Sequence, residues 1–208
     1  MNKPSSAKTK SNKTLCLFDF DGTISHKDSL ADFLVFAFGW SGFIKGLLLN
    51  SLTLLLYLLK IISNDAAKQK FIYSFFKNDS FDAFEILAER YAEQALHKIV
   101  RPQALEKIKW HQAQGHDIYL VSASMENYLK PWGKKLNITV LGTQVKSNNG
   151  HFPKTFASAN CYGAEKVKRI QQALKLTDYT YIYAYGDSRG DTEMLALANE
   201  AIYKPFQN

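Results

Sequence analysis

Two hydrophobic patterns alternate along most of this chain. Short runs rich in β-branched and aromatic residues predict strands at residues 15–19, 116–122, 139–142, 180–186 and 201–204. Apolar positions three and four residues apart predict helices at residues 102–115, 125–136, 164–174 and 191–198. Alternating strands and helices are typical of a parallel α/β sheet with right-handed crossovers, so we predict a Rossmann-like core.

Residues 28–100 interrupt this alternation. Their patterns are helical throughout, at residues 29–40, 43–62, 66–76 and 81–96. We therefore predict an all-helical cap, residues 28–100, inserted into a core made of residues 14–27 and 101–206. Residues 1–13 are polar and rich in lysine, and we predict that they form a disordered tail. Asn148, Asn149 and Gly150 predict a tight turn in a short hairpin that ends near residue 152.

Within the predicted cap, residues 43–62 form a strongly apolar stretch. Its 20 residues match the hydrocarbon thickness of a membrane. However, Lys45 and Lys60 lie near its ends, and Asn50 and Thr53 interrupt its centre, which argues against a spanning helix. A buried cap helix, a helix in the membrane interface and a re-entrant hairpin all remain open.

Composition narrows the classes of function. The 208 residues carry a net charge of +7, which fits an anionic substrate or an anionic membrane surface. We expect no nucleic-acid partner, because no zinc-finger, helix-turn-helix or RNA-binding pattern accompanies the charge. The five histidines show no metal-ligand spacing, so zinc is not indicated.

Cys16 and Cys161 are too few for a disulfide framework and are expected to be free thiols. With no secretory signal pattern, we expect a cytoplasmic protein, either free or at the cytoplasmic face of the membrane.

Pairs of carboxylates follow two of the predicted strands. Asp19 and Asp21 end the first strand, and Asp187 and Asp191 follow the strand at residues 180–186. Because the carboxyl ends of parallel strands meet at one edge of a sheet, these groups are expected to share a cleft. Two unit charges ~4 Å apart repel by about 4 kcal/mol at an effective dielectric constant of 20, so the cluster needs a cation. Carboxylate oxygens favour Mg²⁺, and the sequence therefore predicts a metal-dependent enzyme.

The order of four motifs resembles that of the haloacid dehalogenase (HAD) superfamily of phosphohydrolases. They are DFDGT at residues 19–23 with the preceding strand, Ser122 after a strand, Lys166 near the start of a helix, and GDSRGD at residues 186–191. The helical insertion after the first strand is similar to the phosphoserine-phosphatase-like branch. Within that branch, VSAS at residues 121–124 and CYGAEKV at residues 161–167 are most similar to the phosphatidylglycerophosphatase C type.

The resemblance implies a role for each carboxylate. Asp19 would be the nucleophile that forms an aspartyl-phosphate, and it would also bind Mg²⁺. Asp21 would be the general acid and then the general base, with its backbone carbonyl on the metal. Asp187 would complete the metal site, and Asp191 would act through water or by orienting Lys166. Since a halide leaving group needs no acid, the presence of Asp21 favours phosphoryl chemistry over dehalogenation.

Four further residues would bind substrate. The Ser122 hydroxyl and the Ala123 amide would hold phosphate oxygens, although Ser124 could play the same part. Lys166 would face the transferring phosphoryl group, with Lys168 as a competitor. Asp28 stands at the spacing where phosphoserine phosphatases carry a glutamate for the substrate amine, and it could equally be the N-cap of the first cap helix.

These features predict a Mg²⁺-dependent phosphomonoesterase. An apolar cap and a basic charge balance favour a phosphorylated lipid headgroup such as that of phosphatidylglycerophosphate. The alternatives are a soluble phosphatase for a small metabolite such as phosphoserine, a phosphotransferase, and a non-catalytic membrane- or partner-binding module that keeps the fold. Aspartate in place of glutamate at position 28 weakens the phosphoserine alternative.

Overall fold

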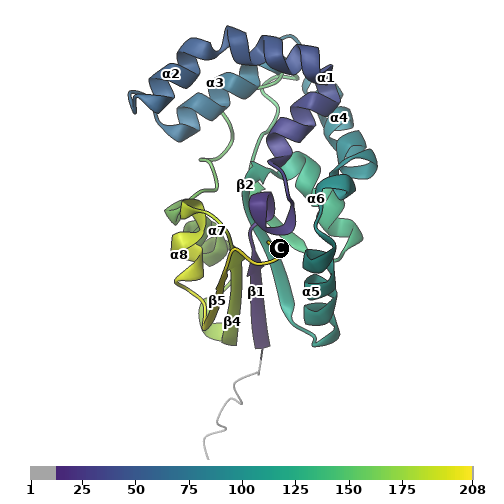
Figure 1. The fold of residues 1–208 in the computed structure, drawn as a ribbon, viewed down its shortest axis with the longest axis vertical. Helices are drawn as coiled ribbons and strands as arrows, with labels where there is room; N and C mark the ends of the chain where they lie inside the picture. The colour runs from purple at the N-terminus through teal and green to yellow at the C-terminus, as the bar shows by residue number, and fades with distance from the viewer. Residues whose placement is uncertain (1–12, 208) are drawn as a thin grey trace, which may run out of the picture.

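The computed structural model describes residues 13–207 and places a parallel sheet at the base of the molecule (Figure 1). Within these residues the strand order is β3-β2-β1-β4-β5, and every neighbouring pair is parallel. The strands are β1 (Lys13–Phe18), β2 (Asp117–Met125), β3 (Thr139–Thr143), β4 (Tyr179–Gly186) and β5 (Glu200–Tyr203). This arrangement confirms the predicted Rossmann-like α/β core. The predicted tail lies outside the described residues, except for Lys13, which already belongs to β1.

Helices cover both faces of the sheet (Figure 1). One face carries α5 (Pro102–Ala113) and α6 (Glu126–Lys135), and the other carries α7 (Ala164–Ala173) and α8 (Thr192–Leu195). Side chains alternate along β1, so Leu15 and Leu17 pack into the cluster of Ile170, while Cys16 and Phe18 join the larger core on the opposite face. A strand buried on both faces must be apolar throughout, which is why β1 was predictable as a continuous apolar run.

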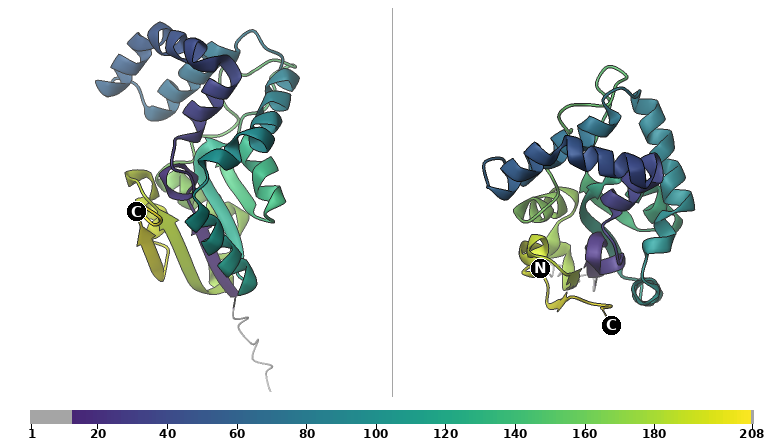
Figure 2. Two further views of the ribbon diagram at one scale, coloured as in Figure 1. Left: turned by 45° about the vertical axis from the view of Figure 1, so that its right-hand side comes forward. Right: turned by 45° about the horizontal axis from the view of Figure 1, so that its top comes forward.

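The segment between β1 and α5 is helical. After the short helical turn η1 (Phe20–Ile24), it contains α1 (Ser29–Leu49), α2 (Ser51–Leu58), α3 (Asn64–Phe76), α4 (Phe81–Gln94) and the 3₁₀ turn η2 (Leu96–Ile99). These helices lie beyond the carboxyl ends of the strands (Figure 2). The segment leaves and returns at one place, because Ser25 pairs with Val100 and the Arg101 amide donates to the Ile24 carbonyl at 2.8 Å.

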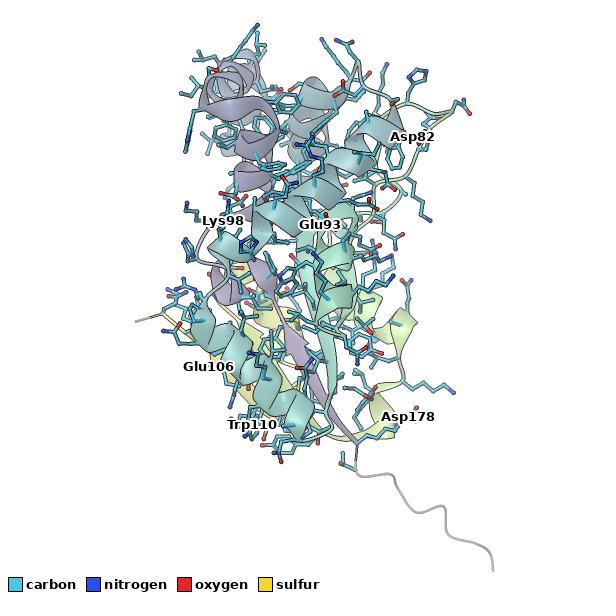
Figure 3. All side chains as sticks on the ribbon, turned by 90° about the vertical axis from the view of Figure 1, so that its right-hand side faces the viewer. Asp82, Glu93, Lys98, Glu106, Trp110 and Asp178 are labelled. Carbon is cyan, nitrogen blue, oxygen red and sulfur yellow. The ribbon has the colours of Figure 1, made fainter. Side chains whose placement is uncertain are left out.

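Local sequence explains where these helices begin and how they pack. Asp28, Ser63 and Ser80 are N-caps whose side chains each accept a backbone N–H three residues later. On α4 and α5 the charged residues Asp82, Glu93 and Glu106 lie on the outward side (Figure 3), whereas the buried positions of both helices face the core. Such amphipathic patterns direct the apolar sides of α4 and α5 towards the hydrophobic core.

One predicted helix is wrong. The sequence pattern predicts a single helix over residues 43–62, but α1 continues to Leu49 and the chain turns at Asn50. The buried Asn50 side chain donates to the Gly46 carbonyl at 2.9 Å and to the Ser74 hydroxyl at 2.7 Å, which ties the turn to α3. By length and apolar composition α1 could cross a membrane, but Gly39, with φ 69°, bends it into two shorter pieces.

The predicted hairpin turn is present. Asn149 and Gly150 have φ values of 50° and 81°, and Asn148 and His151 exchange two backbone hydrogen bonds across them. Positive φ at both central residues is the conformation that Asn-Gly favours in tight hairpins. His151 also pairs with Ser80, so the turn packs beside the start of α4.

Candidate active site

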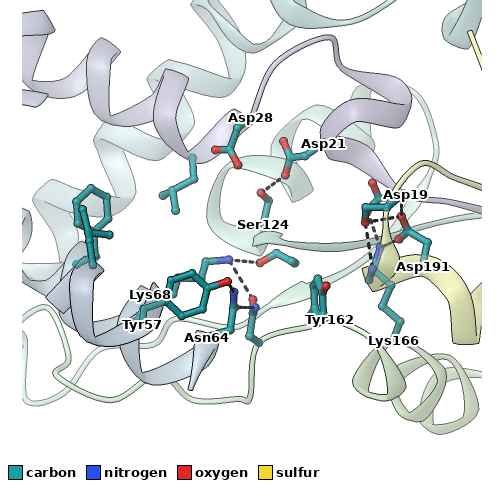
Figure 4. A pocket seen from close by; sticks show the side chains of 18 residues that line it. Asp19, Asp21, Asp28, Tyr57, Asn64, Lys68, Ser124, Tyr162, Lys166 and Asp191 are labelled. Carbon is teal, nitrogen blue, oxygen red and sulfur yellow. Dashed lines mark hydrogen bonds and ion pairs between the residues drawn. The ribbon is translucent and has the colours of Figure 1, made fainter. Parts of the chain in front are cut away.

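A cavity of about 540 Å³ lies between the carboxyl ends of the strands and the helical insertion (Figure 4). From the sheet side it is lined by Asp19, Asp21, Ala123, Ser124, Lys166 and Asp191. From the insertion it is lined by Asp28, Leu54, Tyr57, Asn64, Lys68 and Phe71, among others. Open α/β sheets bind ligands at this edge, where the strand order reverses on either side of β1.

Three carboxylates converge at the sheet edge. One oxygen from each of Asp19, Asp187 and Asp191 lies within 4.8 Å of the others. Asp19 follows β1 and Asp187 follows β4, and the Asp19 amide donates to the Tyr185 carbonyl at 2.9 Å, which carries the strand pairing into the site. Asp191 ends the short turn η4 (Arg189–Asp191), where its side chain accepts from the Ser188 amide at 3.0 Å and from the Ser188 hydroxyl at 2.9 Å.

Lys166 neutralises part of this cluster. Its buried ammonium donates to Asp19 Oδ1 at 2.5 Å, to Asp191 Oδ1 at 2.6 Å and to the Val121 carbonyl at 2.7 Å, so all three of its protons have acceptors. Burial would lower the pKa of Lys166, but the Asp19 and Asp191 carboxylates raise it overall, and the side chain stays charged. Lys168, the other candidate, is exposed and lies 3.4 Å from Glu165.

The pKa values of the carboxylates reflect their surroundings. Burial raises the pKa of Asp19 to about 7, with Lys166 opposing the shift and Asp191 and Asp21 adding to it. Burial also raises the pKa of Asp187, and the charge of Asp191 adds to that rise. For Asp191 burial acts in the same direction, but Lys166 and the Ser188 donors hold its pKa below the usual range.

The donor set fits a hard divalent cation. Three carboxylates against one ammonium leave an excess of negative charge on oxygen atoms alone, which suits Mg²⁺. The Asp187 carboxylate receives only a long bond, 3.4 Å, from the Thr23 hydroxyl, and it lies directly against the backbone of Gly22. A side chain at Gly22, where φ is +82°, would occupy the space of that carboxylate.

Asp21 lies beside this centre and faces the insertion (Figure 4). Its carboxylate accepts from the Ser124 hydroxyl at 2.5 Å and from the Ser29 amide, at the start of α1, at 2.6 Å. The Ser29 hydroxyl lies 2.9 Å from that of Ser124 and 3.2 Å from that of Tyr128. Removal from water raises the pKa of Asp21 to about 6, and the charge of Asp28 adds to the shift.

Residues 16–196 match the family of haloacid dehalogenase-like hydrolases. The chain belongs to that family. Protein CicA of Caulobacter vibrioides is 32% identical over 199 residues, which cover 93% of this chain and 86% of the relative. Family membership, predicted from the order of the motifs, is thus confirmed by a match that contains the whole carboxylate centre.

Solved structures show the same fold. A protein of unknown function from Bordetella pertussis superposes with a TM-score of 0.78 at 21% identity, covering 93% of this chain and 89% of that one. A phosphoserine phosphohydrolase-like protein from Francisella tularensis gives a TM-score of 0.59 at 17% identity, covering 92% and 85%. The predicted phosphoserine-phosphatase-like branch is therefore present among the structural neighbours of this family member.

Ser122 is less exposed to the cavity than the sequence suggests. Among the described residues, Ala123 and Ser124 line the cavity, whereas Ser122 does not. The buried Ser122 hydroxyl accepts from the Ser124 amide at 3.0 Å. The strand β2 continues to Met125 rather than ending at Ser122, and its pairing with β3 is irregular between Val121 and Met125. This bulge directs Ala123 and Ser124 towards the cavity.

Asp28 is the N-cap of α1 and also lines the cavity. Its Oδ1 accepts from the Ala31 amide at 2.8 Å, so it is the N-cap of α1. The same residue is exposed and lines the cavity on the side of the insertion (Figure 4). A capping carboxylate keeps a second oxygen, which is free to meet a ligand.

Lys68 is the functional candidate that sequence reasoning missed. It extends from α3 into the cavity, where Nζ donates to the Ala123 carbonyl at 2.6 Å and to Asn160 Oδ1 at 3.0 Å. Burial lowers its pKa, and the charges of Asp21 and Asp28 oppose that shift. A lysine in a helical pattern normally lies in solvent, so no local feature of residues 66–76 distinguishes Lys68 from Lys70.

Proposed function

We propose that this family member is a Mg²⁺-dependent phosphomonoesterase that acts through an aspartyl-phosphate. The observation that carries the proposal is the convergence of Asp19, Asp187 and Asp191 within 4.8 Å, with Lys166 bonded to two of them. Asp21 stands next to this centre, within hydrogen-bonding distance of Ser124 and Ser29. A nucleophile, a proton donor and a cation site thus share one cavity.

The reaction would proceed in two steps. A carboxylate oxygen of Asp19 attacks phosphorus, the bond from phosphorus to the alcohol oxygen breaks, and Asp21 gives its proton to the departing alkoxide. Asp21, now a carboxylate, takes a proton from water while the water oxygen attacks phosphorus and the bond to Asp19 breaks. The raised pKa of Asp21, about 6, suits a group that both gives and takes a proton.

Each remaining predicted residue has a place in this scheme. Asp19, Asp187 and the backbone carbonyl of Asp21 would hold Mg²⁺, which would offset the negative charge of the phosphoryl oxygens. Lys166 would add a fixed positive charge beside Asp19, and Asp191 orients it through their 2.6 Å contact. The Ala123 amide at the bulge would hold a phosphate oxygen, with Ser122 supporting the bulge through its bond to Ser124.

We further propose that residues 28–100 act as a cap over a core made of residues 14–27 and 101–206. The Ser25–Val100 pairing places both connections at one point, as a hinge requires. The Ser29 amide bonds the catalytic Asp21, so movement of α1 would be coupled to the proton donor. Closure of such a cap would exclude water during the first step.

The substrate that we propose is a phosphorylated lipid headgroup, such as that of phosphatidylglycerophosphate, at the cytoplasmic face of the membrane. The carboxyl-terminal part of α1 and the segment through α2 expose an apolar face, which consists of Trp40, Ile44, Leu48, Leu49, Leu52, Leu55, Leu58, Leu59 and Ile61, each at least 50% exposed. Within α2, all of which is described, no residue is buried. Large apolar side chains exposed on successive helical turns mark a protein or membrane contact.

Two observations favour a membrane as the partner of the apolar face. Lys45 and Lys60 are both exposed beside it, and residues 40–63 contain no acidic residue, which suits an anionic lipid surface. Leu54 and Tyr57, which belong to α2, line the active-site cavity. A lipid whose headgroup reached Asp19 would therefore keep its chains near the apolar face.

One observation favours a soluble substrate. Asp28 and Lys68 line the same cavity with opposite charges, which suits the amine and carboxylate of a small zwitterion such as phosphoserine. Hydrolysis of phosphatidylglycerophosphate in mixed micelles should therefore be compared with that of phosphoserine and other soluble esters, with Mg²⁺ present and Asp19→Asn as the blank. Preference for the lipid supports the proposed substrate. Preference for phosphoserine contradicts the lipid substrate but still agrees with the proposed phosphatase activity.

Two results would contradict the hydrolase itself. No phosphate release from any ester would leave a non-catalytic binding module, and transfer of phosphate to an added alcohol instead of water would indicate a phosphotransferase. Trapping of phosphate on wild-type protein but not on Asp19→Asn, measured by mass spectrometry, tests the covalent intermediate independently of the substrate.

The apolar face can be tested apart from catalysis. The triple variant Leu55→Ser, Leu58→Ser, Leu59→Ser should lose flotation with anionic liposomes and lose activity on the lipid, while keeping activity on a soluble ester. Ile86→Ser, on α4 and 60% exposed, is the matched control outside the apolar face and should behave as wild type. Equal flotation of all three proteins would exclude the apolar face as the membrane contact.

A further inference from the structure

A second cluster of ligand-type side chains lies near the amino-terminal end of β2, away from the cavity. Cys16 Sγ in β1 lies 2.9 Å from His111 Nδ1 and 3.6 Å from His116 Nδ1, and the two Nδ1 atoms are 2.8 Å apart. His111 belongs to the last turn of α5 and His116 to the connection before β2. Cys16 and His111 are fully buried, and His116 is partly buried. Three donor atoms from three segments therefore converge on one point.

The surroundings of the cluster hold the His111 ring as a metal site would. His111 Nε2 lies 2.8 Å from the buried Tyr185 hydroxyl, so a proton on Nε2 leaves the lone pair of Nδ1 directed at Cys16 and His116. A polar partner on the outer ring nitrogen is what fixes the tautomer and orientation of metal-binding histidines. Tyr185 is itself stacked on Phe18 with centroids 4.3 Å apart, and Tyr183 stacks on His116.

We propose that Cys16, His111 and His116 form a transition-metal site, taking Zn²⁺, that is separate from the carboxylate centre. One sulfur and two imidazole nitrogens suit Zn²⁺ and disfavour Mg²⁺, which prefers oxygen. On binding, the metal–sulfur bond replaces the S–H bond of Cys16, and the proton leaves to solvent. A cavity of about 430 Å³, lined by His116, Gln112 and Asp117 among others, reaches one of the three ligands, so the ion would enter from the His116 side.

The ion would have a structural effect. It would add a bond between side chains of β1, α5 and the connection to β2, which are already held together by the β1–β2 pairing and by the hydrogen bond from the His116 amide to the His111 carbonyl. Because Asp19 directly follows β1, three residues after Cys16, a fixed β1 would also hold Asp19 in place. Sequence spacing does not reveal the site, because Cys16 and His111 are 95 residues apart.

Cobalt gives a direct readout of the thiolate ligand. The full-length protein, stripped with a chelator, is titrated with Co²⁺ in an Asp187→Asn background, which weakens the carboxylate centre. One equivalent should produce a thiolate-to-cobalt charge-transfer absorption, and Zn²⁺ should displace it. Cys16→Ser should lose the absorption, whereas Cys161→Ser, which removes the other buried thiol, should keep it.

Two milder substitutions keep the test independent of folding defects. Tyr185→Phe removes the hydroxyl that orients His111, and the affinity for Zn²⁺ should fall by about 10–100-fold. Tyr183→Phe, which keeps the ring packed on His116, should bind as wild type. Zn²⁺ should raise the melting temperature of wild type and of Tyr183→Phe but not of His116→Gln. Three results would show that the cluster is a hydrogen-bonded packing unit only. They are the absence of a charge-transfer band in the Asp187→Asn protein, the same band in Cys16→Ser, and equal Zn²⁺ affinities of the two tyrosine variants.

Discussion

At the scale of single residues, the role proposed for Asp21 as proton donor can be tested apart from the role proposed for Asp19 as nucleophile. Its carboxyl group is held by Ser124 and Ser29 rather than by Lys166, so it is positioned for proton transfer without the charge that stabilises Asp19. Asp21→Asn should slow formation of the aspartyl-phosphate from an alkyl phosphate by about 10²–10⁴-fold. With an aryl phosphate, whose leaving group needs no proton, the loss in the first step should be much smaller. Single-turnover kinetics with both esters measures this difference, and equal losses would exclude Asp21 as the acid.

Lys68 is expected to lower the free energy of unfolding of the protein. Its pKa is lowered by burial despite the opposing charges of Asp21 and Asp28, so the charged form is less favourable in the folded state than in the unfolded chain. Both of its acceptors, the Ala123 carbonyl and Asn160, also accept from the Thr143 hydroxyl, at 2.6 and 3.1 Å. Lys68→Met should therefore raise the melting temperature, by about 2–4 °C for each ~1 kcal/mol gained, while raising KM for an anionic substrate.

The pH dependence of this effect has a definite sign. Between the lowered pKa in the folded protein and the ordinary value of 10.5, the unfolded chain binds more protons, so wild-type stability gains with rising pH from this group. The advantage of Lys68→Met is then fully present below the lowered pKa of the folded protein and disappears as the pH approaches 10.5. Calorimetry at several pH values measures it, and the exposed Lys70→Met, on the same helix, should stay within about 0.5 kcal/mol of wild type. A lower melting temperature for Lys68→Met would contradict the argument.

At the scale of elements, the bend in α1 depends on Gly39. Its φ of 69° and ψ of 172° lie in a region that is essentially restricted to glycine. An added Cβ would meet nothing within 4 Å, so the cost of Gly39→Ala comes from the backbone alone, about 1–3 kcal/mol. Denaturant unfolding should show this loss, while Ser41→Ala, two residues away, should be near neutral. An unchanged stability for Gly39→Ala would show that α1 can straighten.

At the scale of the whole molecule, the carboxylate centre should couple metal binding to stability. Asp19, Asp187 and Asp191 repel one another across at most 4.8 Å, so a bound Mg²⁺ favours the folded state by about 2.7 kcal/mol when its concentration is 100 times Kd. Chelation should abolish hydrolysis, and Mg²⁺ alone should restore it. The rise in melting temperature with Mg²⁺ should persist in Cys16→Ser and vanish in Asp187→Asn. The opposite pattern would show that Mg²⁺ acts at the cluster of Cys16 and not at the carboxylate centre.

Much of the fold followed from the sequence because its patterns are local. The buried part of β1 is apolar at every position, and β4 is a run rich in β-branched and aromatic residues, so both strands stand out, and the polar groups that follow them fall at one edge of the sheet. The candidates Asp19, Asp21, Asp187 and Asp191 needed only that rule, and the spacing Gly163-x-x-Lys166 then favoured Lys166 over Lys168. In the same way, a glycine preceded by asparagine determined the hairpin turn at residues 148–151.

Tertiary structure alone decided which distant side chains meet. The end of α1 at Asn50 depends on its contact with Ser74, and an apolar pattern that continues through residue 62 cannot show it. Lys68 reaches the cavity only because α3 packs over the bulge of β2, and Cys16 meets His111 only because α5 lies on β1. Periodicity records which face of an element is apolar, since that property repeats along the chain. It carries no record of which residue of another element lies opposite, because that depends on packing across tens of residues of sequence.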